Sequence, residues 1–388
     1  MTTESVNQMI EKKLNDNLYI DIHVIQNLPP ACVNRDDTGS PKTAVYGGTT
    51  RARVSSQAWK RAIRQQFNSM FPGDLNGMRT RHIGQIMTEC LIKERPELEE
   101  KKAETIAKKA LKYAGVTDNV LFLISPKQIK ELVKVTVENI DNGKFDKSEK
   151  KKNGKDREPS KKEKKVYEDA VKNNPSIDML LFGRMAAQNK NLNYDATCQV
   201  AHAISTHEIH NEYDYFTAID DYNSNSEDDS GAGHLGTVEY NSSTLYRYAN
   251  INITELQSKL YDDDLLITVI DNFIQAFVSS MPTGKQNTFA NRTLPSLVYI
   301  TLRNDQPINL VEAYEKAIKT SSAGYVDQSI KALANFAHNI YSMYDAYPEH
   351  SWYINLDDVD FDNSEREPNI KKLIDDTTDA IKKEICKS

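Results

Sequence analysis

The stretch from Asn34 to Arg64, NRDDTGSPKTAVYGGTTRARVSSQAWKRAIR, combines strong turn signals, an alternating segment and a helical pattern. Seven of its residues are basic and two are acidic, a local balance of +5 in a chain whose formal net charge is −7. A basic segment within an acidic chain indicates a binding surface. The basic residues are Arg35, Lys42, Arg51, Arg53, Lys60, Arg61 and Arg64.

The order of residues predicts a loop, an extended segment and a helix. Turn residues fill 37–41, and Gly47-Gly48 permits backbone conformations that other residues resist. Arg51–Val54 alternates basic and small apolar residues, as a half-exposed strand or extended loop does. Ser55 or Ser56 can cap the helix that follows.

This helix is expected to have two faces. Apolar residues spaced by three and four define a buried face, formed by Trp59, Ala62, Ile63, Phe67 and Met70. Polar residues at i, i+3, i+4 and i+7 define another face, formed by Gln57, Lys60, Arg61 and Arg64. A row of donors beside a helix N-terminus suits a polyanion backbone. The simpler interpretation is a solvated helix face, but the arginines of the preceding loop favour phosphate binding.

The whole chain has the composition of a folded, water-soluble protein. Its 388 residues, 39% hydrophobic and 27% charged, suffice for one large domain or two ordinary ones. No apolar run approaches the ~20 residues of a membrane helix, and the N-terminus lacks an apolar signal core. The four cysteines form no CxxC pair, which fits a reducing cytoplasm and argues against structural zinc. We therefore expect a cytoplasmic protein with no membrane association.

The clearest strand pattern is Tyr19–Ile25, where apolar and polar residues alternate. Its polar face, with Asp21 and His23, is expected to be free for a ligand or another layer, and Pro29-Pro30 is expected to end the strand. Helices are expected over 80–111, with a break at Pro96, over 125–140, around 265–277 and through most of 311–388, and strands over 238–253 and 297–302. This order predicts an α+β sheet domain with a helical excursion.

Two further segments have alternative interpretations. Residues 141–165 hold 11 basic and 6 acidic residues, so they form either a mobile insertion or a lysine-rich arm for a nucleic-acid backbone. Tyr213, Tyr215 and Phe216 cluster between acidic residues. They can stack on bases from a projecting hairpin, or they can pack in a core.

No catalytic constellation is found. The chain has no nucleotide P-loop and no GxSxG elbow. His207 and His210 could form a metal cluster with His202, but hydrogen-bonded or surface histidines are expected instead. Asp36-Asp37 could bind a divalent cation as nuclease carboxylates do, although adjacent side chains on an extended chain point apart. We expect no enzymatic activity, no cofactor and no bound metal.

The stretch 34–64 resembles the N-terminal signature of the CasC family, the repeated backbone subunit of the type I-E CRISPR Cascade surveillance complex. Further motifs follow in the family's order: LLFGRMA at 180–186, AHAISTHEI at 201–209, DYFTAIDD at 214–221, HLGTVEYNSSTLYRYANIN at 234–252 and MPTGKQNTFA at 281–290. The resemblance covers roughly residues 18–290 and rests on several independent motifs.

The resemblance implies an RRM-like, ferredoxin-type palm with an antiparallel sheet, an inserted helical finger domain and a protruding thumb hairpin. The implied division is an extension at 1–17, a palm at 18–79 and 178–388, fingers at 80–177 with the Lys-rich insertion 141–165, and a thumb hairpin at about 202–235.

The resemblance also implies a non-catalytic function in antiviral defence. Several copies would bind one CRISPR RNA, with thumbs that wedge out bases and present segments for pairing with target DNA. The implied partners are CRISPR RNA, target DNA, further copies, other Cascade subunits and a recruited helicase-nuclease. The palm contacts would be Lys42, Ser55, Gln57, Lys60, Arg61 and Arg64, beside Arg35, Arg51 and Arg53 of the basic loop. Met185 would pack by the kinked nucleotide. The thumb wedge would comprise Tyr215, Phe216, Thr217 and Ile219. The possible DNA contacts are Lys150, Lys151, Lys152, Lys161 and Lys162.

Two alternatives stay open. Related subunits of type III systems cut RNA with an aspartate in a palm loop, and Asp36 or Asp37 lies in a comparable basic loop. The other alternative is a generic RRM-type RNA-binding protein that acts as a monomer.

Overall fold

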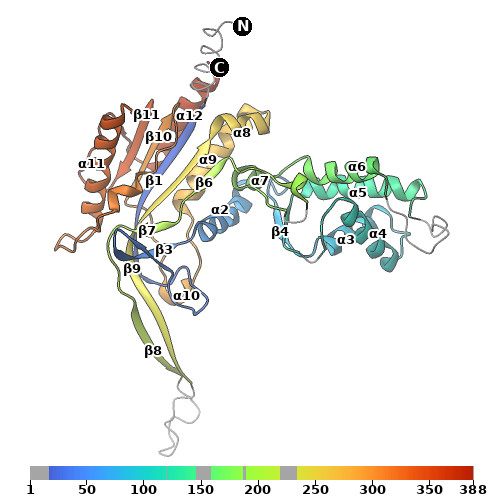
Figure 1. Cartoon of the computed structure of the whole chain (residues 1–388), viewed down its shortest axis with the longest axis horizontal. Coiled ribbons are helices and arrows are strands. Elements are labelled where there is room, and N and C mark those ends of the chain that lie inside the picture. The colour runs from blue at the N-terminus through green and yellow to red at the C-terminus, as the bar shows by residue number, and fades with distance from the viewer. Residues whose placement is uncertain (1–16, 119, 146–158, 187–188, 219–233, 388) are drawn as a thin grey trace, which may run out of the picture. The chain divides into compact units, whose positions relative to one another are not determined.

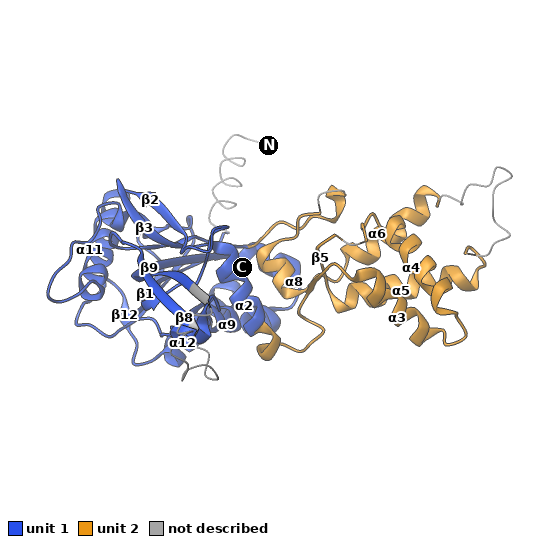
Figure 2. Cartoon of the chain, turned by 90° about the horizontal axis from the view of Figure 1, so that it is seen from below, with its two compact units in different colours: residues 1–66, 198–388 blue, residues 67–197 orange. Residues whose placement is uncertain are grey.

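A computed structural model describes residues 17–118, 120–145, 159–186, 189–218 and 234–387 (Figure 1). The chain divides into two compact units, Met1–Gln66 with Cys198–Ser388, and Phe67–Thr197 (Figure 2). We call them unit 1 and unit 2 and describe each by itself. The predicted extension 1–17 lies outside the described residues except for Asn17. The predicted palm and finger bounds stay a prediction.

Unit 1 is built on strand β1 (Tyr19–Ala31), which lies between two antiparallel neighbours. Ile22 lies opposite Ile300 of β10 (Leu297–Arg303) and Ala249 of β9 (His234–Asn252). The sheet order is β12-β11-β10-β1-β9-β7-β3-β2, and β6 and β8 also pair with β9. The other strands are β2 (Thr43–Tyr46), β3 (Thr49–Val54), β6 (Cys198–Val200), β7 (Ala203–Ser205), β8 (Glu212–Ala218), β11 (His350–Asn355) and β12 (Glu365–Arg366).

The central strand order is that of a ferredoxin-type βαββαβ unit. Helix α2 (Ser56–Met70) follows β1 through the β2–β3 hairpin, and α9 (Asp263–Ser279) connects β9 to β10. The strands β10, β1, β9 and β7 lie side by side in that order. The predicted α+β class with an RRM-like, antiparallel palm is therefore confirmed.

Both faces of the β1 region are buried. Asp21 and His23 have no exposed surface, because α11 (Val326–Tyr344) and the 3-10 helix η3 (Leu310–Tyr314) cover their face of the sheet. Figure 1 shows α11 on one side of the sheet and α8 (Ile253–Leu260) and α9 on the other. Of the two expected uses of this polar-aromatic face, a ligand or another layer, the structure shows another layer.

Two buried polar groups of this face have hydrogen-bond partners inside the protein. Asp21 accepts hydrogen bonds from the Tyr248 hydroxyl (2.7 Å) and the Ile308 N–H (3.0 Å). Burial raises the pKa of Asp21 to about 7. His23 Nδ1 lies 2.9 Å from the Tyr246 hydroxyl, and burial lowers the pKa of His23 to about 3.

Three local predictions for unit 1 were wrong. Strand β1 continues through Pro29-Pro30 to Ala31, because the prolines fall where its register with β9 becomes irregular, and a bulge needs no proline N–H. The C-terminal region, predicted as mostly helical, contains α11 and α12 (Ile370–Ile385) but also strand β11. The predicted loop 281–290 contains the single turn α10 (Gln286–Phe289).

Unit 2 is a helical unit around its own core. The predicted helix break at Pro96 is confirmed, and so is the Ser125 cap, whose hydroxyl accepts from the Gln128 N–H. A capping box of Ser160 and Glu163 begins α6, so the last part of the predicted mobile insertion is helical. The helices are α3 (Ile83–Glu94), α4 (Glu100–Tyr113), α5 (Pro126–Asp141), α6 (Lys161–Lys172) and α7 (Ile177–Phe182), with strands β4 (Met78–Thr80) and β5 (Phe122–Ile124). Across the described residues, no helix is long and apolar enough to span a bilayer.

Candidate nucleic-acid interface

Helix α2 carries the basic surface, and buried residues on its other side hold it in place. Ser55 precedes its first residue, and the Ser55 carbonyl accepts from the Ala58 and Trp59 N–H groups. Trp59 and Ile63 are buried, as the spacing predicts. Gln57 and Arg61 are exposed, while Lys60 and Arg64 are half-buried. The amphipathic pattern therefore leaves a row of polar and cationic side chains at the surface.

A buried arginine supports this helix. The Arg247 guanidinium of β9 stacks 3.7 Å from the Trp59 ring centroid and 4.6 Å from that of Phe277 on α9. It donates to Gln26 Oε1 (2.6 Å) and to the Phe277 carbonyl. Burial lowers the pKa of Arg247 to about 9. Arg247 thus ties α2, α9 and the sheet together beneath the basic surface.

Arg51 is not part of that surface, in contrast to the prediction. Its guanidinium is fully buried and donates to the carbonyls of Ser205 (2.9 Å), Tyr314 (2.9 Å) and Glu315 (3.3 Å). These carbonyls come from β7 and from the end of η3, which cover this end of β3. Arg51 therefore holds the chain around β3 and has no exposed atom to offer a ligand.

Ser55 is also largely buried. Its N–H donates to Asn34 Oδ1 (2.9 Å), and its carbonyl begins α2. Ser55 therefore links the basic loop to the helix, and its role as an RNA contact stays a prediction.

Arg53 lies on the same face of β3 as Arg51 but remains half-exposed. Its Nε donates to the Thr43 carbonyl (3.0 Å), and its Nη1 lies 3.3 Å from His202 Nδ1. Burial, with the charges of Arg53 and Lys42, lowers the pKa of His202. Lys42, Arg53 and His202 therefore form one basic cluster at the end of β3. The position of His202 could not be predicted from the sequence, because the pairing of β3 with β7 brings it beside Arg53.

The loop that carries Arg35 is closed by Asp36. Asp36 Oδ1 accepts from the Thr38 hydroxyl (2.7 Å) and from the N–H groups of Thr38 and Ser40 (both 3.0 Å). The hydrogen bond from the Thr38 hydroxyl is the main reason why the pKa of Asp36 is lowered. Such a turn holds one carboxylate in a structural role and leaves Arg35 and Asp37 exposed.

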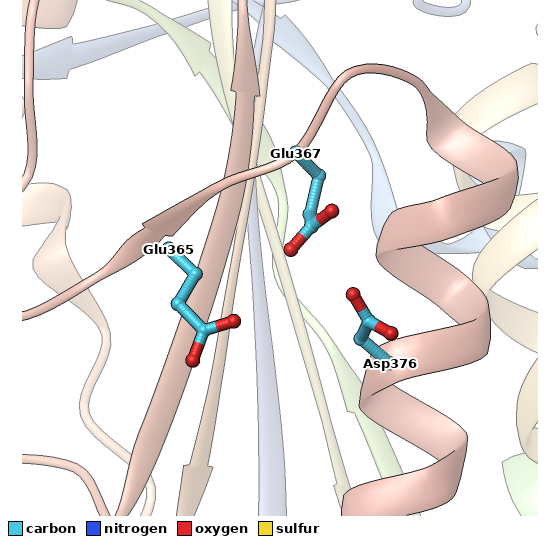
Figure 3. A group of neighbouring side chains, drawn as sticks. All are labelled: Glu365, Glu367 and Asp376. Atoms are coloured by element: carbon cyan, nitrogen blue, oxygen red, sulfur yellow. The ribbon is translucent and has the colours of Figure 1, made fainter.

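Within the described part of the chain, one group of three acidic side chains could hold a metal ion, and it lies elsewhere. Glu365, Glu367 and Asp376 bring ligand atoms within 4.8 Å of one another beside β12 and α12 (Figure 3). Lys372 pairs with Asp376. Neither Asp36-Asp37 nor the histidines of 202–210 form such a group among the described residues. His207 Nε2 accepts from the Thr244 N–H (3.1 Å), so this histidine has a structural role.

The predicted thumb residues lie on a two-stranded hairpin of β8 and β9 (Figure 1). Tyr215 lies opposite Thr237, and Phe216 lies opposite Gly236. Tyr215 is 72% exposed, Phe216 is 44% exposed, and Thr217 is exposed. These three residues lie within the paired part of β8, and Ile219 falls outside the described residues.

Unit 2 holds the remaining candidate residues. Met185 is 85% exposed. Its neighbour Arg184 is buried between the rings of Phe122 and Tyr194 and donates to the carbonyls of Leu192, Leu123 and Val171. Arg184 therefore anchors the segment that presents Met185.

The lysines of the insertion divide into two groups. Lys161 and Lys162 are exposed in the first turn of α6, beside an open groove of about 370 Å³ whose cationic lining is Lys161, Lys164, Lys165 and Lys172. Lys150, Lys151 and Lys152 lie outside the described residues.

Comparison with known proteins identifies the family. A sequence profile described as "CT1975-like protein" matches residues 20–380. The chain belongs to this family. The resemblance drawn from the sequence motifs is therefore confirmed at the level of the family, and no curated protein matches the CT1975-like chain.

Two solved structures resemble this CT1975-like chain over nearly its whole length. A chain of a "CRISPR RNA-guided surveillance complex, pre-nicking" is 32% identical with a TM-score of 0.81. A chain of a "CRISPR RNA-guided surveillance complex" is 29% identical with a TM-score of 0.73. Each alignment covers 93% of this chain and 99% of the other.

Proposed function

We propose that this CT1975-like chain is a backbone subunit of a type I-E CRISPR Cascade complex. The observation that carries the proposal is the 32% identity, over 93% of the chain, to a chain of an RNA-guided CRISPR surveillance complex. Several copies would bind one CRISPR RNA and assemble with other Cascade subunits in the cytoplasm as part of antiviral defence.

The basic surface of α2 would hold the RNA by its phosphates. Gln57, Lys60, Arg61 and Arg64 lie along one face of the helix. The cluster of Lys42 and Arg53 at the end of β3 would extend this surface toward Arg35. Cationic contacts to phosphate carry no base preference, so one surface would accept any guide sequence.

The hairpin and unit 2 would shape the guide and meet the target. The β8–β9 hairpin of one copy would wedge out a base through Tyr215, Phe216, Thr217 and Ile219, and Met185 would pack against the kinked nucleotide. The guide would then pair with target DNA in short segments. The lysines at 150–152, with Lys161 and Lys162, would contact that DNA.

The proposed role is binding without catalysis, and cleavage would belong to a recruited helicase-nuclease. The engagement of Asp36 in its own loop supports this view. A type III-like role would require metal-dependent cleavage of complementary RNA that is lost on Asp36→Ala or Asp37→Ala. A generic RRM-type protein would bind RNA as a monomer.

The test is a tagged pulldown from cells that express a CRISPR array and the companion genes, followed by sequencing of the bound RNA. The proposal expects repeat-flanked spacer RNAs in a particle with several copies of this chain. Recovery of a single copy with random RNA, or with none, would contradict it.

A further inference from the structure

Strand β1 contains a β-bulge near its end. Leu28 pairs with Ser243 of β9 and Ala31 pairs with Asn241, so two residues of β1 lie opposite one residue of β9 between these pairs. Ser243 and Asn241 are two positions apart on β9, so their side chains point to the same side of the sheet. Bulges often lie next to functional sites, where they re-aim side chains. The surroundings of Ser243 and Asn241 are therefore a candidate site.

These two side chains line an open recess, which we call the bulge recess. Its other polar lining residues are Asn34, Lys42 and Arg53. These three residues are half-exposed, so the recess opens at the surface. Its volume is about 20 Å³, which holds one water-sized group. The bulge recess can therefore take a single small polar group, and it is too small for a base.

The bulge recess lies on the same side of the sheet as helix α2. Ser243 and Arg247 are four positions apart on β9, so their side chains point to the same side. Arg247 stacks on Trp59 of α2. Lys42 and Arg53, which line the recess, belong to the basic cluster proposed to extend the surface of α2. A polynucleotide held by these cations would therefore pass beside the recess.

The hydroxyl of Ser243 can bind a group in this recess. Ser243 is 5% exposed, and among the described residues its hydroxyl has no hydrogen-bond partner. A buried hydroxyl without a partner costs free energy, which a bound polar group recovers. A small polar group in the recess would supply the missing hydrogen bond.

Two asparagines of the lining present one acceptor and one kind of donor. Asn211 Nδ2 donates to Glu239 Oε2 (3.2 Å), so Asn211 Oδ1 accepts from Asn241 Nδ2 (3.0 Å). This leaves the carbonyl oxygen of Asn241 as an acceptor. Asn34 Oδ1 accepts from the Ser55 N–H (2.9 Å), which leaves the amide N–H groups of Asn34 as donors. The lining therefore offers both donors and acceptors in addition to the serine hydroxyl.

This mixture of donors and acceptors selects among the groups of a polynucleotide. A phosphate oxygen only accepts, so the carbonyl oxygen of Asn241 disfavours it. The ribose 2′-hydroxyl both donates and accepts, and it is present in RNA but not in DNA. It also has the size of a water molecule. The 2′-hydroxyl is therefore the group that fits the bulge recess.

We infer that the bulge recess takes a ribose 2′-hydroxyl of the bound RNA, and that Ser243 distinguishes RNA from DNA. This inference rests on the proposed function and names the sugar as a part of the RNA that the chain recognises. A contact to the 2′-hydroxyl carries no base preference, so the recess would act at any guide sequence.

The test measures the affinity of the full-length protein for one RNA oligonucleotide and for its 2′-fluoro counterpart. Fluorine keeps the RNA-like sugar conformation and is small enough for the recess, but it cannot donate a hydrogen bond. The wild-type protein should bind the RNA about fivefold more tightly, which corresponds to one hydrogen bond. Ser243→Ala should lower the affinity for RNA to that for the 2′-fluoro oligonucleotide and leave the latter affinity unchanged. The salt dependence should stay the same, because no phosphate contact is lost.

Two further variants separate the outcomes. Ser242→Ala removes the exposed neighbouring hydroxyl on the other side of β9 and should bind both oligonucleotides as the wild type does. Lys60→Ala with Arg64→Ala tests the proposed function itself. It should weaken the binding of both oligonucleotides by the same factor and reduce the salt dependence.

The inference is overturned if the wild-type protein binds both oligonucleotides equally, a result that depends on no variant. It is also overturned if Ser243→Ala keeps the full preference for RNA. If Ser243→Ala weakens both affinities equally and reduces the salt dependence, the recess holds a phosphate and the inference is wrong. If the α2 variant binds RNA as tightly as the wild type, the proposed function fails instead.

Discussion

The basic surface of α2 and the β8–β9 hairpin belong to the same unit but are built in opposite ways. The surface of α2 lies on a helix whose other side is buried against the sheet, with Arg247 stacked beneath Trp59. The hairpin is a two-stranded ribbon with exposed residues on both faces. On the proposed function, α2 would supply affinity for a charged polymer from cations on a rigid support. The hairpin would interrupt base stacking with aromatic rings on a projecting element.

The largest effect is expected from loss of the support beneath α2. Arg247→Ala removes a fully buried guanidinium and takes its hydrogen bonds from Gln26 Oε1 and the Phe277 carbonyl. The free energy of unfolding should fall by about 3 kcal/mol. Urea unfolding monitored by tryptophan fluorescence measures this change. Arg292→Ala is the matched control, because Arg292 is exposed. An equal loss of unfolding free energy in both variants would contradict the structural role of Arg247.

A stability effect of similar size concerns the covered face of the sheet. The pKa of Asp21, about 7, lies above its unfolded value of 3.8, so its contribution to stability is present below pH 4 and is lost as the pH rises toward 7. The pKa of His23, about 3, lies below its unfolded value of 6.5, so its contribution is present above pH 6.5 and is lost as the pH falls toward 3.

These two slopes oppose each other between about pH 4 and 6.5. Asp21→Asn removes the slope that Asp21 contributes, so only the slope from His23 remains. The free energy of unfolding should then rise with pH by about 1.4 kcal/mol per unit across this window. Urea titrations at several pH values measure the slope. If the pH dependence of stability in Asp21→Asn is as flat as in the wild type, Asp21 and His23 are not buried as described.

An intermediate effect is expected at the basic surface itself. Lys60→Ala with Arg64→Ala should weaken binding to every single-stranded RNA sequence alike, by roughly tenfold or more. The slope of log K against log salt should fall in magnitude by about 1.4, because two phosphate contacts are lost. Lys331→Ala is the control, since Lys331 pairs with Asp327 on α11. A loss restricted to some sequences would mean base contacts instead.

The smallest effect is expected in the hairpin. Gly236→Ala should displace the Phe216 ring and speed amide exchange in β8, with a loss of roughly 1 kcal/mol confined to the hairpin. RNA affinity should change less than twofold, because the α2 surface is untouched. Hydrogen exchange read by mass spectrometry tests this, and faster exchange in β1 as well would argue against an independent hairpin.

Local patterns predicted the elements that depend on neighbouring residues. The alternation at Tyr19–Ile25 and the spacing of Trp59, Ile63 and Phe67 correctly predicted β1 and the buried side of α2. The patterns could not separate Arg51 from Arg53, which occupy equivalent positions on one face of β3. Contacts with β7 and with η3, which lie far later in the chain, decide that one is buried and the other is not.

Contacts between distant strands were likewise invisible in the sequence. His202 joins Lys42 and Arg53 because β3 pairs with β7, and strand pairing is set by the whole sheet. Strand β11 was missed because six residues within a helix-rich region give a weak signal. The predicted thumb strands were identified from the family motifs and not from periodicity alone.

Strand β9 has a mechanical consequence. Its 19 residues extend roughly 60 Å, and one half is held between β1 and β7 while the other half leaves the sheet with β8 (Figure 1). The hairpin thus projects from the sheet and is held at one end only, by the strands of the palm. Its stiffness comes from the anchored half. A single residue inserted in β9 after Asn241 would rotate its free half by half a turn and would exchange the side chains that each face presents.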